Sequence, residues 1–230
     1  MITHVHRDPV IVTWTDAGWT TRPDGTSQGG HVVMMADADL LAGKESHMTL
    51  LSWHSGKLSR VARSSSSAET QTAADGDDES VYVRLCMSEL LFGEINIKHW
   101  QDYVRRIPAA LVLDCRGVYD ALARSASSYL GLKDKKSGLE ALAFKPSLHM
   151  CGTALRWIHS AAQLGDMMTK DSDVARGPWS LLVQRGHRWK LVHDPTFESA
   201  RKRAKRGADV LEDSSMQDEE QIPKDSQALV

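Results

Sequence analysis

A chain of 230 residues is long enough for one sizeable α/β domain with its own core, and short for two ordinary domains. Hydrophobic residues make up 41% of it and charged residues 25%, which excludes collagen-like, wholly disordered and multi-span membrane proteins. The formal net charge of −2 gives no overall attraction to a polyanion, so a nucleic acid would have to be bound by a local basic surface or through metal.

The cysteines and the N-terminus bear on the cellular compartment. Cys86, Cys115 and Cys151 have no CxxC spacing and are odd in number, which indicates reduced thiols rather than a disulfide scaffold. The first ten residues contain no apolar segment of a signal peptide, and no window approaches about eighteen uninterrupted apolar residues. We therefore expect an intracellular protein, cytoplasmic or nuclear, with no membrane partner.

The first part of the chain predicts an antiparallel meander. Residues 10–15 are β-branched and aromatic, as in a buried strand, and run directly into Asp16. A turn at 22–25 and the alternation over 30–35 predict a second strand paired back on the first. Residues 50–54 predict the third strand.

A helix is predicted after the serine run at 64–67, because serine hydroxyls cap helix N-termini. We expect it to start near Ser66, to carry Glu69, and to bury an imperfect apolar stripe that ends at Phe92. Gly76 lies within it and would weaken the helix by roughly 1 kcal/mol relative to alanine.

The rest of the predicted elements alternate between strand and helix, which is the order of an α/β protein. In chain order they are a central strand at 111–113 that ends at Asp114, a helix at 118–123, a short helix at 137–144 that stops before Pro146, a strand at 155–158 and a helix at 164–170.

We therefore divide the chain into an N-terminal extension (1–10), one domain (11–190) and a basic, then acidic tail (191–230). The tail is predicted to be disordered, because its composition cannot bury enough apolar surface to offset the entropy of ordering it. The basic cluster 201–206 is either a solvated charge run, a nuclear localisation signal or a nucleic-acid contact.

Four acids are placed where these elements could converge: Asp16, Glu69, Asp114 and Asp166. Each one alone could be a solvated residue or a helix cap. Asp16 and Asp114, however, directly follow buried-looking strands with no adjacent cation in the sequence, and a carboxylate there is normally paired, protonated or bound to metal. Oxygen ligands suit Mg²⁺ or Mn²⁺, and no paired-His or Cys motif indicates zinc. Two ions about 3.5–4 Å apart could hydrolyse a phosphodiester.

At these residues the sequence resembles the ribonuclease H domain of copia-type LTR retrotransposon Pol polyproteins. The matching pieces follow the family's order and cover most of the chain: Thr15-Asp16-Ala17-Gly18-Trp19, residues 26–30, residues 51–57, residues 62–71 ending Ala68-Glu69-Thr70-Gln71, residues 113–120 beginning Leu113-Asp114, and residues 163–170 with Gly165-Asp166. Position 165 is glycine where the family usually has alanine, which could loosen the start of the helix that holds Asp166.

The resemblance implies a ribonuclease H-like α/β fold, with a mixed five-stranded sheet that contains a three-strand antiparallel meander and is flanked by helices. It implies an endonuclease that hydrolyses the RNA strand of RNA/DNA hybrids during reverse transcription, with a reverse transcriptase domain as a possible partner. Asp16, Glu69, Asp114 and Asp166 would be catalytic and would bind two Mg²⁺ (or Mn²⁺) ions. His159 matches a mobile histidine that assists product release in some relatives, or is merely structural. The sequence gives no oligomeric state.

Two alternatives stay open. One is a catalytically inactive or repurposed ribonuclease H-like module that binds nucleic acid, and the other is a nuclease of the same fold that acts on DNA. Lys57, Arg60 and Arg63 could lie against substrate phosphates or form an ordinary basic loop.

The tryptophans are predicted to be core residues rather than base-stacking platforms, since most fall within apolar strands. They are Trp14, Trp19, Trp53, Trp157 and Trp179.

Overall fold

The computed structural model describes residues 6, 8–123 and 135–191. The tail predicted at 191–230, apart from Leu191, and most of the predicted N-terminal extension lie outside the described residues. Within the described ranges, no helix combines the length and the apolar character needed to cross a membrane.

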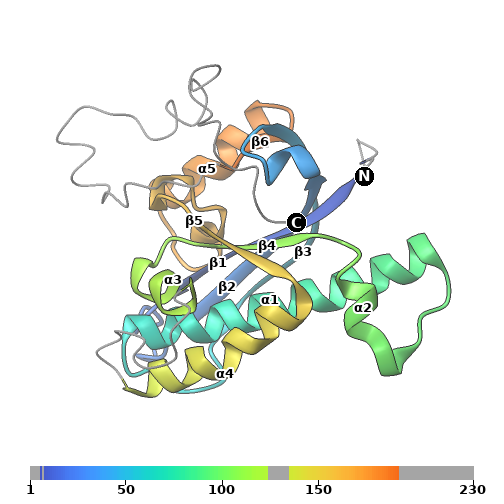
Figure 1. Ribbon diagram of the computed structural model, residues 1–230. Coiled ribbons are helices and arrows are strands. Elements are labelled where there is room, and N and C mark those ends of the chain that lie inside the picture. Colours follow the sequence, from blue (N-terminus) through green and yellow to red (C-terminus); the bar gives the residue numbers. More distant parts are fainter. Residues whose placement is uncertain (1–5, 7, 124–134, 192–230) are drawn as a thin grey trace, which may run out of the picture.

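The centre of the fold is a six-stranded mixed sheet with the order β5-β4-β1-β2-β3-β6 (Figure 1). The strands are β1 (Pro9–Gly18), β2 (Gln28–Asp37), β3 (Glu45–Lys57), β4 (Ala109–Leu113), β5 (Thr153–Trp157) and β6 (Arg188–Lys190). The first three form the predicted antiparallel meander, whereas β4 is parallel to β1 and β5 is parallel to β4. β1 is almost entirely buried, as its continuous run of apolar and threonine residues predicts for a central strand.

Helices cover both faces of this sheet. The α-helices are α1 (Ser65–Phe92), α2 (Trp100–Val104), α3 (Arg116–Ala123), α4 (Lys135–Cys151) and α5 (Asp173–Gln184), and the 3₁₀ segments are η1 (Ala38–Leu40), η2 (Ile97–His99), η3 (Ser160–Ala162) and η4 (Leu164–Met168). Figure 1 shows α1 and α4 side by side on one face and α5 on the other. η4 packs between α5 and the strands β1 and β2.

This mixed sheet with its meander and flanking helices confirms the predicted ribonuclease H-like α/β fold. The sheet has six strands rather than five, because β6 pairs with β3 over Glu45–His47. Neither β6 nor α5 is predicted from the sequence. β6 has only three residues, with Trp189 as its single apolar side chain, which is too short to show a period.

Two predicted helices differ in the structure. The helix predicted to stop before Pro146 continues through it to Cys151. Proline removes one backbone hydrogen bond, but Phe144 and Leu148 on either side of it are buried in one cluster, and this packing holds the helix together. The helix predicted at 164–170 is instead the 3₁₀ helix η4 over Leu164–Met168.

Helix α1 starts at Ser65, one residue before the predicted position, and the Ser64 side chain caps it by accepting a hydrogen bond from the Ser67 N–H at 3.1 Å. Its buried face is mostly small and polar, and the predicted apolar stripe is wrong at Phe92, which is exposed. Small side chains bring the helix axis close to the sheet.

Gly76 is a point of close approach between α1 and the sheet. A Cβ atom added there would lie 2.5 Å from Thr15 Cγ2 and 3.3 Å from Thr13 Cγ2. The position predicted to weaken the helix is therefore one where the fold has no room for a side chain.

We expect Gly76→Ala to lower the free energy of unfolding by about 1–3 kcal/mol, because the new methyl overlaps a β-branched side chain on a central strand. Gly177→Ala in α5 is the matched control: nothing lies within 4 Å of its Cβ position, so the helical preference of alanine should stabilise by about 0.5–1 kcal/mol. Urea unfolding of the two variants should give opposite signs. Stabilisation by both would show that α1 does not pack this tightly.

The tryptophan prediction is correct for Trp14 and Trp157, which are buried, and Trp179 is partly buried. It is wrong for Trp19 and Trp53, which are 45% and 61% exposed. Trp53 lies on the part of β3 that β6 does not cover, so a strand of core-like composition is in fact a sheet edge there.

Candidate active site

The register of two parallel strands brings Asp16 and Asp114 together. Trp14 of β1 pairs with Val112 of β4, and each aspartate follows two positions later. Asp16 is still within β1 and is buried, while Asp114 comes directly after β4. The sequence therefore places both carboxylates at the same edge of the sheet.

Asp166 is brought to this edge by η4. A Cβ atom added at Gly165 would lie 3.2 Å from both the Asp16 nitrogen and the Thr15 carbonyl carbon. The glycine was expected to loosen this segment, but it lets η4 pack directly on the backbone of β1. An alanine there would need a shift of a few tenths of an ångström.

The three aspartates form one cluster, in which a carboxylate oxygen of each lies within 4.8 Å of those of the other two. Glu69 of α1 lies beside them and accepts a hydrogen bond from the Ala17 N–H. Burial, followed by the charges of Asp114 and Asp16, raises the pKa of Glu69 well above its ordinary value. All four predicted acids are thus brought to one place.

The cluster concentrates negative charge in a sheltered site. Burial and then the charge of Asp16 raise the pKa of Asp114, and the same two causes raise the pKa of Asp166 to about 7. The electrostatic penalty would fall if a cation were held between the carboxylates. A set of carboxylate oxygens with this charge fits Mg²⁺ or Mn²⁺.

Lys170 supplies a cation that the sequence analysis missed. Its Nζ lies 3.1 Å from Asp16 Oδ1 and 2.7 Å from Asp166 Oδ1. Burial lowers the pKa of Lys170, but the charges of Asp16 and Asp166 outweigh this and raise it, so the ammonium is charged. Thr169 donates a hydrogen bond to Asp16 Oδ2. The available signal was the i,i+4 spacing of Asp166 and Lys170.

Gln163 ties the cluster together and was also missed. Its buried Nε2 donates to the Thr15 carbonyl at 3.0 Å, and its Oε1 accepts from the Gly165 N–H at 3.1 Å. Its side chain also hydrogen-bonds Asp114, which lowers the pKa of that carboxyl against the rise due to burial. One side chain therefore contacts the immediate surroundings of all three aspartates.

His159 follows β5 and is buried. Its Nδ1 accepts the Ala161 N–H at 3.1 Å and caps η3. The next residue, Ser160, hydrogen-bonds the Asp114 carboxylate. The structure gives His159 a capping role at the margin of the cluster, and a part in product release stays a prediction.

Two of the basic residues that precede α1 form exposed ion pairs. Lys57 Nζ lies 3.4 Å from Asp24 Oδ2, and Arg60 lies 3.6 Å from Glu140. Exposed pairs of this kind contribute about 0–1 kcal/mol, so they would exchange readily for phosphate contacts. Phosphate binding by Lys57, Arg60 and Arg63 stays a prediction.

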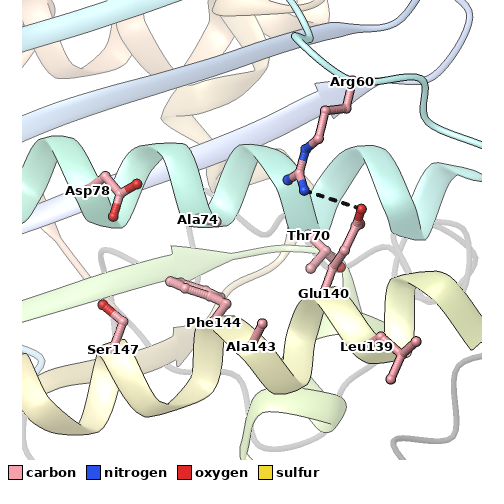
Figure 2. A pocket seen from close by; sticks show the side chains of 9 residues that line it. All are labelled: Arg60, Thr70, Ala74, Asp78, Leu139, Glu140, Ala143, Phe144 and Ser147. Carbon is pink, nitrogen blue, oxygen red and sulfur yellow. Dashed lines mark ion pairs between the residues drawn. The ribbon is translucent and has the colours of Figure 1, made fainter.

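A cavity of about 450 Å³ lies between α1 and α4, and none of the four acids lines it. Figure 2 shows Arg60 reaching across to Glu140 at one end, with Ala74 and Phe144 beneath and Asp78 further along α1. Two acids against one cation make this cavity unsuitable for a phosphodiester, because the substrate is itself an anion.

The raised pKa of Asp166 predicts a pH-dependent stability. In the metal-free protein Asp166 keeps its proton up to pH about 7, whereas in the unfolded chain it loses it near 3.8. The folded state binds more protons in this window, so its stability should fall as the pH rises from about 4 to 7. Melting temperatures in chelator should show wild type losing stability over that window relative to Asp166→Asn. Parallel curves would contradict the shift.

No protein-family model matches the chain, and no curated protein matches it. Among solved structures it is similar to the protease-reverse transcriptase of prototype foamy virus, with 12% identity, a TM-score of 0.41, 81% of this chain covered and 22% of that chain. It is also similar to RuvC of Thermus thermophilus, with 9% identity, a TM-score of 0.30, 80% of this chain covered and 100% of that one. The chain thus spans 22% of the length of the viral protein. At these levels of similarity the fold assignment rests on the strand order and connectivity.

Proposed function

We propose that this chain is a divalent-metal-dependent endonuclease that hydrolyses the RNA strand of RNA/DNA hybrids, as part of the reverse transcription of a copia-type retrotransposon. The observation that carries the proposal is the gathering of Asp16, Asp114 and Asp166, with carboxylate oxygens within 4.8 Å of one another, beside Glu69. The resemblance of the sequence motifs to copia-type ribonuclease H domains implies this substrate and a reverse transcriptase domain as partner.

The residues that would hold two Mg²⁺ or Mn²⁺ ions are Asp16, Glu69, Asp114 and Asp166. Such ions, when bound, activate a water and stabilise the leaving oxygen of a phosphodiester. The donor set is all oxygen and strongly anionic. The pKa values of Glu69, Asp114 and Asp166 are raised first by burial and then by the charges of neighbouring aspartates, and a divalent cation would offset that repulsion.

The protein itself would supply rigid positioning. Asp16 lies on a buried strand, Glu69 on α1 and Asp166 on η4, and Gln163 cross-links the segments that carry the aspartates. Ligands held by packed elements and second-layer hydrogen bonds keep the geometry that a two-ion site requires.

The test is cleavage of a hybrid labelled on the RNA strand, with the same sequence as duplex DNA and duplex RNA beside it. The purified chain should cut only the RNA strand of the hybrid, and only with Mg²⁺ or Mn²⁺. Chelator should abolish the cut and added metal should restore it.

Other results would select other functions. Cleavage of duplex DNA in preference to hybrid would indicate a DNA nuclease of the same fold. Salt-sensitive binding of hybrid by a well-folded chain that never cuts would indicate an inactive binding module, and the nuclease proposal would fail.

A further inference from the structure

We propose that Lys170 is an exchangeable cation, which holds the carboxylate cluster together in the metal-free protein and leaves the carboxylates when metal binds. This inference rests on the proposed metal-dependent function and adds to it a residue that sets the metal affinity.

The position of the ammonium carries the argument. Lys170 Nζ bridges Asp16 Oδ1 at 3.1 Å and Asp166 Oδ1 at 2.7 Å, and both residues belong to the three-aspartate cluster. Asp16 and Asp166 are also two of the residues that would hold Mg²⁺ or Mn²⁺, so the ammonium and the metal would compete for the same carboxylates. An ammonium and a divalent ion held at the same carboxylates would repel strongly.

The lysine is able to leave. Its side chain is 41% exposed, whereas those of Asp16 and Asp166 are 2% and 11% exposed. The carboxylates are thus held in place while the lysine is bounded by solvent on one side. A four-carbon stem lets the charge move away from the cluster with little rearrangement of the backbone.

Thr169 would hold Asp16 in place independently of Lys170. Its hydroxyl donates to Asp16 Oδ2, the other oxygen of the carboxylate that Lys170 contacts. When Lys170 departs, Asp16 keeps a hydrogen-bond partner that holds its orientation.

The experiment compares wild type with Lys170→Met and Lys170→Gln, using Mn²⁺ alone as the probe. Isothermal titration calorimetry should show Mn²⁺ binding about tenfold more tightly to both variants, because the metal no longer displaces a competing cation. Lys44→Met is the matched control: Lys44 pairs with Asp39 on η1, at the other end of β2 from the cluster, so removing it makes the same charge change with little effect on Mn²⁺ affinity.

A second readout distinguishes an exchangeable lysine from a permanent partner. In chelator both variants should melt below wild type, because the carboxylates have lost their counter-charge. In saturating Mn²⁺ the difference should disappear. If the deficit persists with Mn²⁺, Lys170 remains in contact with the carboxylates and the inference is overturned.

The two proposals fail in different ways. If wild type binds Mn²⁺ tightly and the Lys170 variants bind it with the same affinity, the proposed exchange is overturned but the proposed metal site is not. Absence of Mn²⁺ binding in folded wild type and in folded Lys170 variants alike would overturn both.

Discussion

Replacing Asp114 by asparagine is expected to slow hybrid cleavage by at least about a thousandfold, or ~4 kcal/mol of transition-state stabilisation. Asp114 interacts with two of the other acids: the charge of Asp16 raises the pKa of Asp114, and the charge of Asp114 raises the pKa of Glu69. The amide keeps the volume but removes a charged oxygen ligand. Melting in chelator should be unchanged or higher, because one negative charge leaves a crowded cluster.

The matched control is Asp120→Asn, since Asp120 pairs with Arg116 on the surface of α3 at 3.5 Å. It should cleave at the wild-type rate. Single-turnover rates at saturating enzyme separate a loss of chemistry from a loss of binding. An Asp114→Asn protein that cuts within tenfold of wild type would remove Asp114 from the proposed ligands.

Arg84→Met is expected to lower the free energy of unfolding by about 3–5 kcal/mol. The Arg84 guanidinium is completely buried and donates to the Ile107 carbonyl at 2.9 Å, the Cys151 carbonyl at 2.6 Å and Thr153 Oγ1 at 3.2 Å. These bonds join α1 to the segment before β4, the end of α4 and the start of β5. Methionine would leave three buried acceptors without this donor.

Charge adds to this effect. Burial lowers the pKa of Arg84 to about 10 and raises the pKa of buried Asp77, on the same helix, to about 6. Without the guanidinium, buried Asp77 would lose the positive charge that stabilises its carboxylate. Urea unfolding should therefore show Arg84→Met/Asp77→Asn to be more stable than Arg84→Met alone.

Arg176→Met provides the comparison, because Arg176 is half exposed and pairs with exposed Asp171 and Asp173. Its loss should be no more than about 1 kcal/mol. Similar effects of the two arginine substitutions would mean that the buried network does not hold α1 in place.

The sequence predicts the centre of the fold well, because the central strands are buried on both faces. β1 and β4 have continuous apolar or β-branched runs, and their composition alone identifies them. The edges are harder. β3 has the composition of a core strand, but β6, a three-residue strand from the far end of the domain, pairs with it only over Glu45–His47 and leaves the stretch around Trp53 as a sheet edge. Local patterns carry no information on that pairing.

The sequence predicted that the acids of the candidate site would come together, but not which other residues would contact them. Asp16 and Asp114 are conspicuous because each directly follows an apolar or β-branched run, although β1 itself continues past Asp16 to Gly18. Parallel pairing of β1 and β4 puts the two side by side. Gln163 and Lys170 have weaker signals, a place in the 163–170 motif and, for Lys170, the i,i+4 spacing from Asp166. Glutamine and lysine are otherwise ordinary surface residues until the tertiary structure places them. The close contact of Gly165 with the backbone of β1 could not be predicted either, because helix propensity does not describe tertiary packing. The expected loosening of this segment stays a prediction.

The separation of Asp16 and Lys170, 154 positions apart in the chain, has a consequence for folding kinetics. The anionic cluster cannot form until η4 has docked on β1, so its assembly is a long-range and comparatively slow event. A metal ion that binds only the docked state would stabilise that state, and with it the whole domain, by mass action. If metal binding is used as the signal during refolding, its time course should thus report when η4 docks on β1.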